Sequence, residues 1–436
     1  MGANAKTGRR LFILSLDGVP HSFLLAATAT GRFPNLARLG RPVEIRSTLP
    51  PVSSVAWATF STGVNPGNHG IFGFIDRDPA TLSERIPSSR DLSSPTLWEM
   101  LNAQGKKTIA INVPLTYPPL DVDGIMVSCF LCTDLARGVT PRSLLPRLEA
   151  LDYRIDPDPA LAATDRAAYF DEILATFRAR RRALLDLFTE PWDLFMCHVM
   201  MTDRVNHVFW KDGHDEESPF HERFWSFYQE VDDLVGEVDE LLPTDVGFFL
   251  LSDHGFCALE QEVDLNAALA RGRLLSYGKG GTGLRAIAES SAYSLLPGRV
   301  YLHANGRDGA ARAVREQASD LLTTLADADR NAVLEKVLPR EEAYSGRCVE
   351  SAPDLVGLPH PGFDLKGRFS PGPIFSGAST RSGMHTVGDA FALVRGQELR
   401  PGGSILDATP TVFELMGLAI PRHLEGTSLL ENGSQR

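Results

Sequence analysis

The residues best suited to chemistry in this sequence are acidic and histidine side chains that follow apolar, strand-like runs or lie in turns, spread over almost the whole chain. They are Asp17, Asp203, His207, Asp253, His254 and His385. Carboxylate and imidazole groups together bind borderline divalent ions such as Zn²⁺ and leave coordination positions open for water or a substrate oxygen. The set therefore predicts hydrolysis at a site with two metal ions.

A hydroxyl-rich turn lies between the first of these aspartates and the rest. It spans residues 47–71, STLPPVSSVAWATFSTGVNPGNHGI, and leads into an apolar helix. The turn can place Ser53 at the N-terminus of that helix, where the helix dipole and the free backbone amides favour an anionic ligand. A nearby metal ion would make its hydroxyl a better nucleophile. This arrangement indicates displacement at phosphorus, with the neighbouring Ser54 as the alternative nucleophile.

These segments resemble the alkaline phosphatase superfamily and, within it, the type I phosphodiesterase/nucleotide pyrophosphatase-like phosphohydrolases. The resemblance runs from LDGVP at 16–20 through TGVNPGNHGI at 62–71, the Asp203 and His207 pair and SDHG at 252–255 to His385. It closes with ILDATPTVFELMGLAIPRHLEGTSLL at 405–430 and so covers essentially the whole chain.

The family pattern, transferred residue by residue, implies two metal sites and one nucleophile. One ion would be bound by Asp17, Asp253 and His254, and the other by Asp203, His207 and His385. Ser53 would bridge toward both ions and carry the phosphoryl group in a covalent intermediate that water then hydrolyses. Two cations about 3.5–4 Å apart can stabilise both the attacking and the leaving oxygen of an in-line displacement. We therefore expect two divalent ions, Zn²⁺ with Mn²⁺ as the alternative.

Two departures from the family pattern bear on the substrate. Many nucleotide pyrophosphatases carry an asparagine shortly after HGI that helps to hold a phosphoryl oxygen, and the spacing places Phe74 there in this chain. The Cys or Ser followed by x-Pro-x-Arg that sulfatases convert to formylglycine is absent at Ser53, which argues against sulfate esters. We expect a small-molecule phosphate ester as substrate, with phosphodiesters or nucleotide pyrophosphates favoured over phosphomonoesters and phosphonates or their esters. A catalytically inactive metal-binding scaffold is the non-enzyme alternative.

Apolar runs predict the strands that must position these side chains. They lie at Leu11–Leu16, Thr108–Val113, Leu194–Met200, Val246–Ser252 and Ala390–Val394. Because these runs alternate with helical segments, we expect an α/β fold with a doubly wound, mainly parallel sheet and helices on both faces. Ligands of such sheets lie at the carboxyl ends of the strands. Residues 1–257 and 381–436 should form an alkaline phosphatase-like catalytic core, and the insertion 258–380 a cap that determines specificity.

Composition and charge fit a large α/β protein that acts on a small molecule. The chain has 436 residues, of which 43% are hydrophobic, enough for one large core with insertions. Its net charge of −12 argues against a general nucleic-acid-binding surface. An anionic substrate would therefore be attracted by the local charge of the metal ions.

The start of the chain and its cysteines favour a cytoplasmic location. The apolar run that ends at Asp17 follows basic residues, but it is too short for a signal peptide and lacks a small-residue cleavage site. No other stretch approaches the length of a membrane span. Five cysteines, an odd number, suit a reducing compartment. Cys129 and Cys132 have CxxC spacing, but without a second CxxC a redox or zinc role is disfavoured.

Three segments are expected to have no fixed structure. YGKGGTG at 277–283 lacks the GKS/T ending of a phosphate-binding P-loop, and we interpret it as a plain mobile loop. Residues 1–9 and 431–436 are polar or small and should be disordered.

Overall fold

The computed structural model describes residues 9–78, 81, 83–278, 283–303, 308–378 and 380–431. The centre of the glycine-rich segment and nearly all of the terminal residues discussed above lie outside the described residues, so those two expectations stay predictions. Within the described ranges, no helix is long and apolar enough to cross a lipid bilayer. All five cysteines lie within these ranges and carry free thiols.

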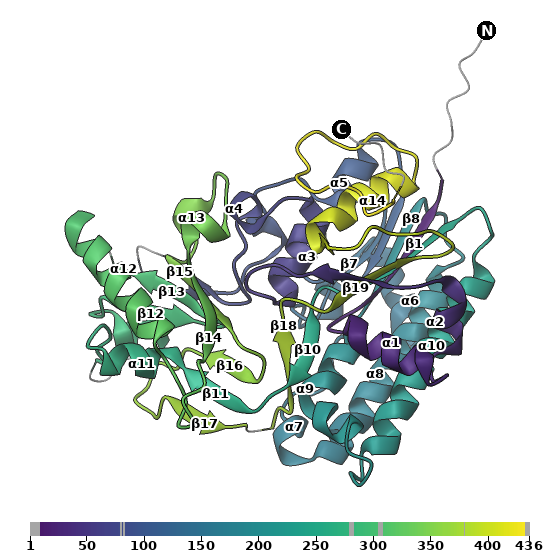
Figure 1. Ribbon diagram of the computed structural model, residues 1–436. Coiled ribbons are helices and arrows are strands. Elements are labelled where there is room, and N and C mark those ends of the chain that lie inside the picture. The colour runs from purple at the N-terminus through teal and green to yellow at the C-terminus, as the bar shows by residue number, and fades with distance from the viewer. Residues whose placement is uncertain are drawn as a thin grey trace.

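In the described part of the chain, a nine-stranded sheet with the order β20-β2-β19-β9-β1-β8-β5-β6-β7 forms the centre of the larger lobe (Figure 1). Its parallel middle consists of β9 (Gly247–Leu251), β1 (Leu11–Leu16), β8 (Leu194–Val199), β5 (Thr108–Ile111) and β6 (Gly124–Val127). On one side of that middle lies the antiparallel strand β7 (Val139–Thr140). On the other side lies the antiparallel strand β19 (Ala390–Val394), followed by β2 (Val43–Arg46) and β20 (Gly403–Ser404) at the edge. The predicted α/β class with a mainly parallel sheet is confirmed.

The five strands predicted from apolar runs are all present, and β1 and β19 have the predicted bounds. β5 ends before Val113 because Asn112 adopts a left-handed backbone conformation, with φ at 64°, that interrupts a strand. β8 ends at Val199 because Met200 already has the right-handed helical conformation that leads into the next helix. β9 begins one residue later and ends one residue earlier than predicted. The apolar pattern therefore located the strands and differed from the structure only at their ends.

Strand β1 is buried on both faces, as expected at the middle of a parallel sheet. Phe12 and Leu14 contribute to the hydrophobic cluster on one face, whereas Leu11 and Ile13 contribute to the cluster on the other. The alternation follows from the opposite directions of successive side chains in a strand. With both faces covered, a polar group on this strand is accessible only where the strand ends.

Helices cover both faces of the sheet. The first face packs against α1 (His21–Ala29), α2 (Pro34–Leu39), α8 (Arg166–Leu187), α9 (Met201–Gly213) and α10 (His221–Leu241). The second face packs against α3 (Ser53–Thr62), α5 (Leu97–Asn102) and α14 (Ala408–Leu415). Shorter elements of this lobe are α4 (Pro66–His69), α6 (Leu145–Ala150), α7 (Leu161–Thr164), β3 (Asp76–Arg77) and β4 (Glu84–Arg85).

The segment that connects the paired antiparallel strands β10 (Gly255–Ala258) and β18 (Gly383–Thr386) forms a second, smaller lobe, on the left in Figure 1. Among the described residues it contains a three-stranded sheet, β16 (Phe363–Lys366), β11 (Gln261–Asp264) and β17 (Phe375–Gly377). A four-stranded sheet follows the order β12 (Ala292–Leu295), β13 (Arg299–Leu302), β15 (Leu355–Pro359) and β14 (Leu334–Pro339). Helices α11 (Leu265–Arg271), α12 (Asp308–Thr323) and α13 (Arg340–Ala343) complete it. This lobe has a hydrophobic cluster of its own.

Candidate active site

The six predicted ligands come together where the parallel strands end. Asp17 directly follows β1, and the Asp253 and His254 pair follows β9 after one residue. Asp203 and His207 lie one turn apart on α9, which begins two residues after β8. His385 lies in β18, the strand that returns the chain from the smaller lobe. Residues more than 350 positions apart in sequence thus share one site because the sheet gathers its strand ends at one edge.

Ser53 is the first residue of α3 and lies among these side chains. Its hydroxyl donates a hydrogen bond to Asp17 Oδ1 at 3.3 Å and lies 3.4 Å from His254 Nε2. Ser54, the alternative nucleophile, is fully buried, and its hydroxyl has no hydrogen-bond partner among the described residues. The geometry therefore places Ser53, and not Ser54, beside the acidic and histidine groups.

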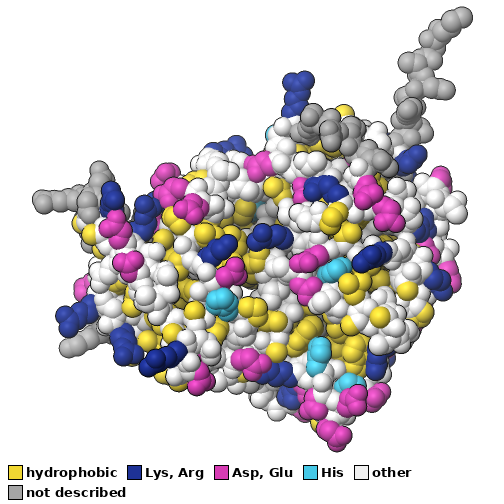
Figure 2. Space-filling model, viewed as in Figure 1, with side chains coloured by type: hydrophobic (Ala, Val, Ile, Leu, Met, Phe, Trp, Pro, Cys, Tyr) yellow, Lys and Arg dark blue, Asp and Glu magenta, His cyan; other side chains and the backbone are white. Residues whose placement is uncertain are grey.

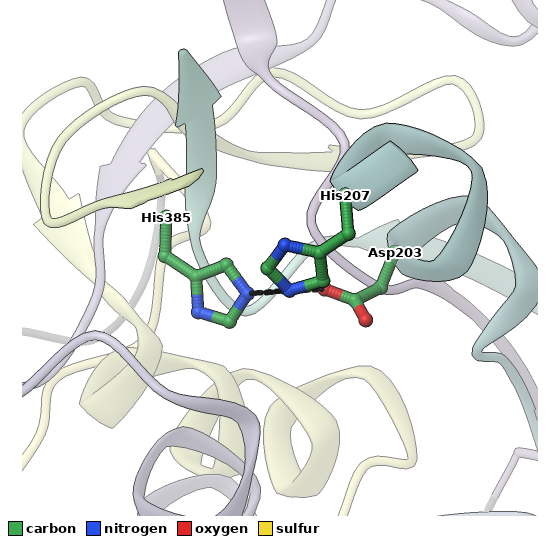
Figure 3. A group of neighbouring side chains, drawn as sticks. All are labelled: Asp203, His207 and His385. Atoms are coloured by element: carbon green, nitrogen blue, oxygen red, sulfur yellow. Dashed lines mark hydrogen bonds and ion pairs between the residues drawn. The ribbon is translucent and has the colours of Figure 1, made fainter. Parts of the chain in front are cut away.

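Asp203, His207 and His385 converge on one point (Figure 3). The Nε2 atoms of the two imidazoles lie 2.9 Å apart. Asp203 Oδ1 lies 3.3 Å from Nε2 of His207 and 3.1 Å from Nε2 of His385. Burial lowers the pKa of His207, and burial together with the charge of His254 lowers that of His385 to about 4, so both rings are neutral at pH 7.

The second nitrogen of each histidine is held by a backbone carbonyl. His207 Nδ1 lies 3.1 Å from the carbonyl oxygen of Gly383, and His385 Nδ1 lies 2.9 Å from that of Pro51. His254 Nδ1 lies 3.1 Å from the carbonyl oxygen of Gly255. A carbonyl only accepts hydrogen bonds, so in a neutral ring the proton is on Nδ1 and the lone pair is on Nε2. The neutral rings of His207 and His385 therefore present Nε2 in the form that binds a metal ion, and His254 would do so once its Nε2 loses its proton.

Asp17, Asp253 and His254 form the other half of the site and are all fully buried. The backbone N–H of Gly18 donates to Asp253 Oδ1 at 3.2 Å, and Gly18 has φ at +63°. Burial and the carboxylate of Asp17 raise the pKa of Asp253 to about 8. Although burial opposes it, the carboxylates of Asp253 and Asp17 raise the pKa of His254 to about 9. Asp253 and His254 therefore hold protons at pH 7, and a bound cation would take the place of those protons.

The donor set fits two divalent ions. Two groups have ligand atoms within 4.8 Å of one another: Asp203 with His207 and His385, and Asp203 with Asp17 and His254. Asp203 is thus common to both groups, although the family pattern assigned it to the first. Asp253 belongs to neither group, but its Oδ2 is buried without a hydrogen-bond partner among the described residues and lies 3.4 Å from His254 Nε2. Two facing imidazole lone pairs and three buried carboxylates are a stable arrangement only with positive charge between them.

Two further residues position Asp17 and were not singled out from the sequence. His198 Nε2 lies 2.9 Å from Asp17 Oδ2, and its Nδ1 lies 2.9 Å from the hydroxyl of Ser15. The indole N–H of Trp57 donates to Asp17 Oδ2 at 3.3 Å. Ser15 and His198 are paired neighbours on β1 and β8, a register that the sequence alone does not give. Trp57 lies one helical turn after Ser53. That four-residue spacing was the signal in the sequence that its side chain lies on the same face of the helix as the nucleophile.

A cavity of about 310 Å³ opens beside Ser53, Asp203, His207 and His385. Its walls are largely apolar and come from both lobes: Phe74, Ile75 and Phe130 from the larger, and Leu296, Pro297 and Leu365 from the smaller. Phe74 and Phe130 pack edge to face with their ring centroids 5.6 Å apart. Phe74 thus lies in the wall of the cavity that also contains Ser53.

Acidic and basic side chains are interspersed over the face of the molecule that shows both lobes (Figure 2). Near the cavity, the guanidinium of Arg204 lies 2.8 Å from Asp156 and 3.4 Å from Asp203, and 5.0 Å from the ring centroid of Phe130. Arg204 therefore partly balances the charge of a predicted metal ligand.

Comparison with known proteins agrees with this geometry. The family model for type I phosphodiesterase/nucleotide pyrophosphatase matches residues 11–387, which include Ser53 and all six predicted ligands. No curated protein matches the chain in sequence. Among solved structures, murine ectonucleotide pyrophosphatase/phosphodiesterase 5, an inactive variant in complex with AMP, has a TM-score of 0.59 at 15% identity, covering 98% of this chain and 97% of its own. That likeness supports the alkaline phosphatase-like fold. The chain belongs to the type I phosphodiesterase/nucleotide pyrophosphatase family and is a hydrolase of phosphoric esters.

Proposed function

We propose that the protein hydrolyses phosphodiesters or nucleotide pyrophosphates through a phosphoryl-Ser53 intermediate at a site with two divalent ions. The observation that carries the proposal is the position of the Ser53 hydroxyl, at the start of α3 and within 3.4 Å of both Asp17 and His254. The AMP complex of the murine structural relative supports a nucleotide-like substrate.

Asp203, His207 and His385 would hold one ion, and Asp17, Asp253 and His254 the other, with Asp203 close to both. When bound, the ions supply positive charge to the attacking and leaving oxygens of the displacement. The carboxylate and neutral imidazole donors suit Zn²⁺, with Mn²⁺ as the alternative.

The chain itself orients the nucleophile. Because Ser53 begins a ten-residue helix, its backbone environment favours the negative charge of a phosphoryl group. The hydroxyl is only 3% exposed and its hydrogen bond to Asp17 fixes its direction. Attack of Oγ on phosphorus forms the bond to Ser53 and breaks the bond to the leaving alcohol or phosphate. Water then cleaves the Ser53 ester and regenerates the hydroxyl.

The cavity favours diesters over monoesters. Arg204, Lys366 and Arg381 line the cavity and could bind a negative oxygen, but the wall beside Ser53 also carries Phe74 and Phe130. An apolar wall instead has room for the organic group that a diester keeps on phosphorus. Phosphomonoester and phosphonate or phosphonate-ester hydrolysis are the alternatives.

Turnover of bis(p-nitrophenyl) phosphate tests the proposal. Purified protein should lose activity on chelation and regain it with Zn²⁺ or Mn²⁺, and kcat/KM should exceed that for p-nitrophenyl phosphate and p-nitrophenyl phenylphosphonate. Activity that persists without bound metal would refute the metal dependence. Metal-loaded protein that turns over no ester in a broad panel would instead indicate an inactive scaffold.

We further propose that residues 258–380 act as a cap that determines substrate specificity, because this lobe supplies part of the cavity wall. A cytoplasmic location stays a prediction based on the cysteine count.

A further inference from the structure

Arg299, at the start of β13 in the smaller lobe, is a fully buried cation. Among the described residues it forms no ion pair with a carboxylate, and its hydrogen bonds go to uncharged oxygens. A buried charge is costly unless it is fully hydrogen-bonded, so such a residue is retained where its geometry matters. This guanidinium has no place in the metal site or in the catalytic step.

The guanidinium joins the two lobes. Its Nε donates to the carbonyl oxygen of Leu296 at 2.8 Å, within its own lobe. Its Nη2 donates to the carbonyl oxygen of Ile75 at 2.6 Å, in the larger lobe. Its Nη1 donates to the hydroxyl of Tyr301 at 3.2 Å. The planar group thus fixes two carbonyls that belong to different lobes relative to each other.

A glycine makes this contact possible. A Cβ atom added to Gly73 would lie 2.5 Å from Cζ of Arg299, closer than any real contact between such atoms. The guanidinium therefore packs directly on the backbone two residues before Ile75. A side chain at position 73 would have to displace it.

The two carbonyls belong to residues that form the lip of the cavity beside Ser53. Ile75 and Leu296 both line that cavity, one from each lobe. Their side chains are 38% and 44% exposed, which is unusual for large apolar residues in this chain. Exposed apolar side chains on opposite lobes at one cavity mouth are suited to enclose an apolar group of a bound ligand.

We propose that Arg299 is a positioning residue that sets the distance between Ile75 and Leu296, and that this lip gives the enzyme its preference for a bulky apolar ester group. This inference rests on the proposed phosphodiesterase function. It assigns selectivity to the contact between the lobes, which Arg299 holds, while the displacement depends on Ser53 and the ligands.

Two diesters that share a leaving group measure the preference. Phenyl p-nitrophenyl phosphate should have a kcat/KM at least about tenfold above that of methyl p-nitrophenyl phosphate in the wild type. Ile75→Ser and Leu296→Ser change exposed side chains and should reduce this ratio through a higher KM for the phenyl ester.

Arg299→Met and Gly73→Ala should reduce the same ratio with the metal content unchanged. Arg299→Lys should not restore it, because one ammonium group cannot reproduce the planar fork that spans both carbonyls. Arg347→Met is the matched control, since exposed Arg347 also donates across the lobes, to Ser94 Oγ at 3.3 Å, without lining the cavity. It should leave the ratio at the wild-type value.

Binding separates failure of this inference from failure of the proposed function. Calorimetry on metal-loaded protein should give a lower Kd for phenyl phosphate than for methyl phosphate, and Ile75→Ser and Leu296→Ser should remove the difference. If no diester is hydrolysed but this pattern holds, the function is wrong and the lip is retained. If diesters are hydrolysed but folded Arg299→Met, Ile75→Ser and Leu296→Ser all keep the wild-type preference, or lose both substrates equally, the inference is wrong.

Discussion

The Nε2 atoms of His207 and His385 lie 2.9 Å apart while the Nδ1 atom of each ring is bonded to a backbone carbonyl. Two neutral rings held in this way direct lone pairs at the same point, with Asp203 Oδ1 within 3.3 Å of both. A cation at that point removes the repulsion and explains why the backbone fixes both rings.

Replacement of His385 should remove one ion and most of the activity. In His385→Ala, elemental analysis should show a fall from two metal ions per chain to one. kcat/KM for bis(p-nitrophenyl) phosphate should fall by at least about 100-fold, because charge at one reacting oxygen is no longer stabilised. Two retained ions with wild-type turnover would exclude His385 as a ligand.

The two adjacent serines should differ sharply. Ser53→Ala should bind both ions and form no covalent intermediate, because the hydroxyl beside Asp17 is lost. Ser54→Ala should keep turnover and stability near wild type, since its hydroxyl has no hydrogen-bond partner among the described residues. Intact-mass analysis of acid-quenched reactions, with phosphoryl-enzyme as the signal, distinguishes the two. Trapping of phosphoryl-enzyme in Ser53→Ala but not in Ser54→Ala would move the nucleophile by one residue.

His198 should tune the metal site without touching substrate. Its Nε2 lies 2.9 Å from Asp17 Oδ2, so His198→Phe should weaken metal binding at Asp17 by about 10- to 100-fold. Competition with a chromophoric chelator measures this affinity. Trp57→Phe, which loses only the N–H bond to Asp17, is the milder comparison and should have a smaller effect. Unchanged affinity in folded His198→Phe would reduce His198 to a packing role.

His69 should make the fold sensitive to acid. Burial lowers its pKa to about 3, from the ordinary value of 6.5. The backbone N–H of Ile71 donates to its Nδ1, and its Nε2 lies 2.9 Å from the hydroxyl of Thr59. The unfolded chain therefore takes up a proton on this ring below pH 6.5, whereas the folded chain does so only near pH 3. The stability that the neutral ring provides is complete above pH 6.5 and is lost as pH falls toward 3.

Denaturant titrations of metal-free protein between pH 7 and pH 4.5 measure this effect. The free energy of unfolding should fall with decreasing pH, with a contribution from His69 of up to about 1.4 kcal/mol per pH unit. His69→Asn should be less stable at pH 7 but have a shallower slope. Parallel slopes for the two proteins would show that His69 does not contribute.

Much of the fold could be predicted from the sequence because its signals are local. Continuous apolar runs such as Leu11–Leu16 identify strands buried on both faces, and polar residues at their ends indicate a site. The grouping of ligands was less accessible. Asp203 lies near both halves of the site because of the direction in which α9 leaves the end of β8. The sequence does not give the angle between that strand and that helix.

Contacts between distant segments were not predictable from spacing. His198 looked like an ordinary strand residue until its register opposite Ser15 placed it against Asp17. Arg299 in RVYL gives no sign that it is buried, because the carbonyls that bind it belong to a preceding turn and to the other lobe. Phe74 was noted as a departure, and only the structure shows its contact with Phe130 in the cavity wall.

Anomalous diffraction from crystals soaked in Zn²⁺ tests the central claim most directly. The account predicts two peaks about 3.5–4 Å apart, one bound by His207 and His385 and one by Asp17 and His254, with Ser53 Oγ facing the space between them. A single peak, or zinc bound away from Ser53, would contradict a two-metal displacement at this serine.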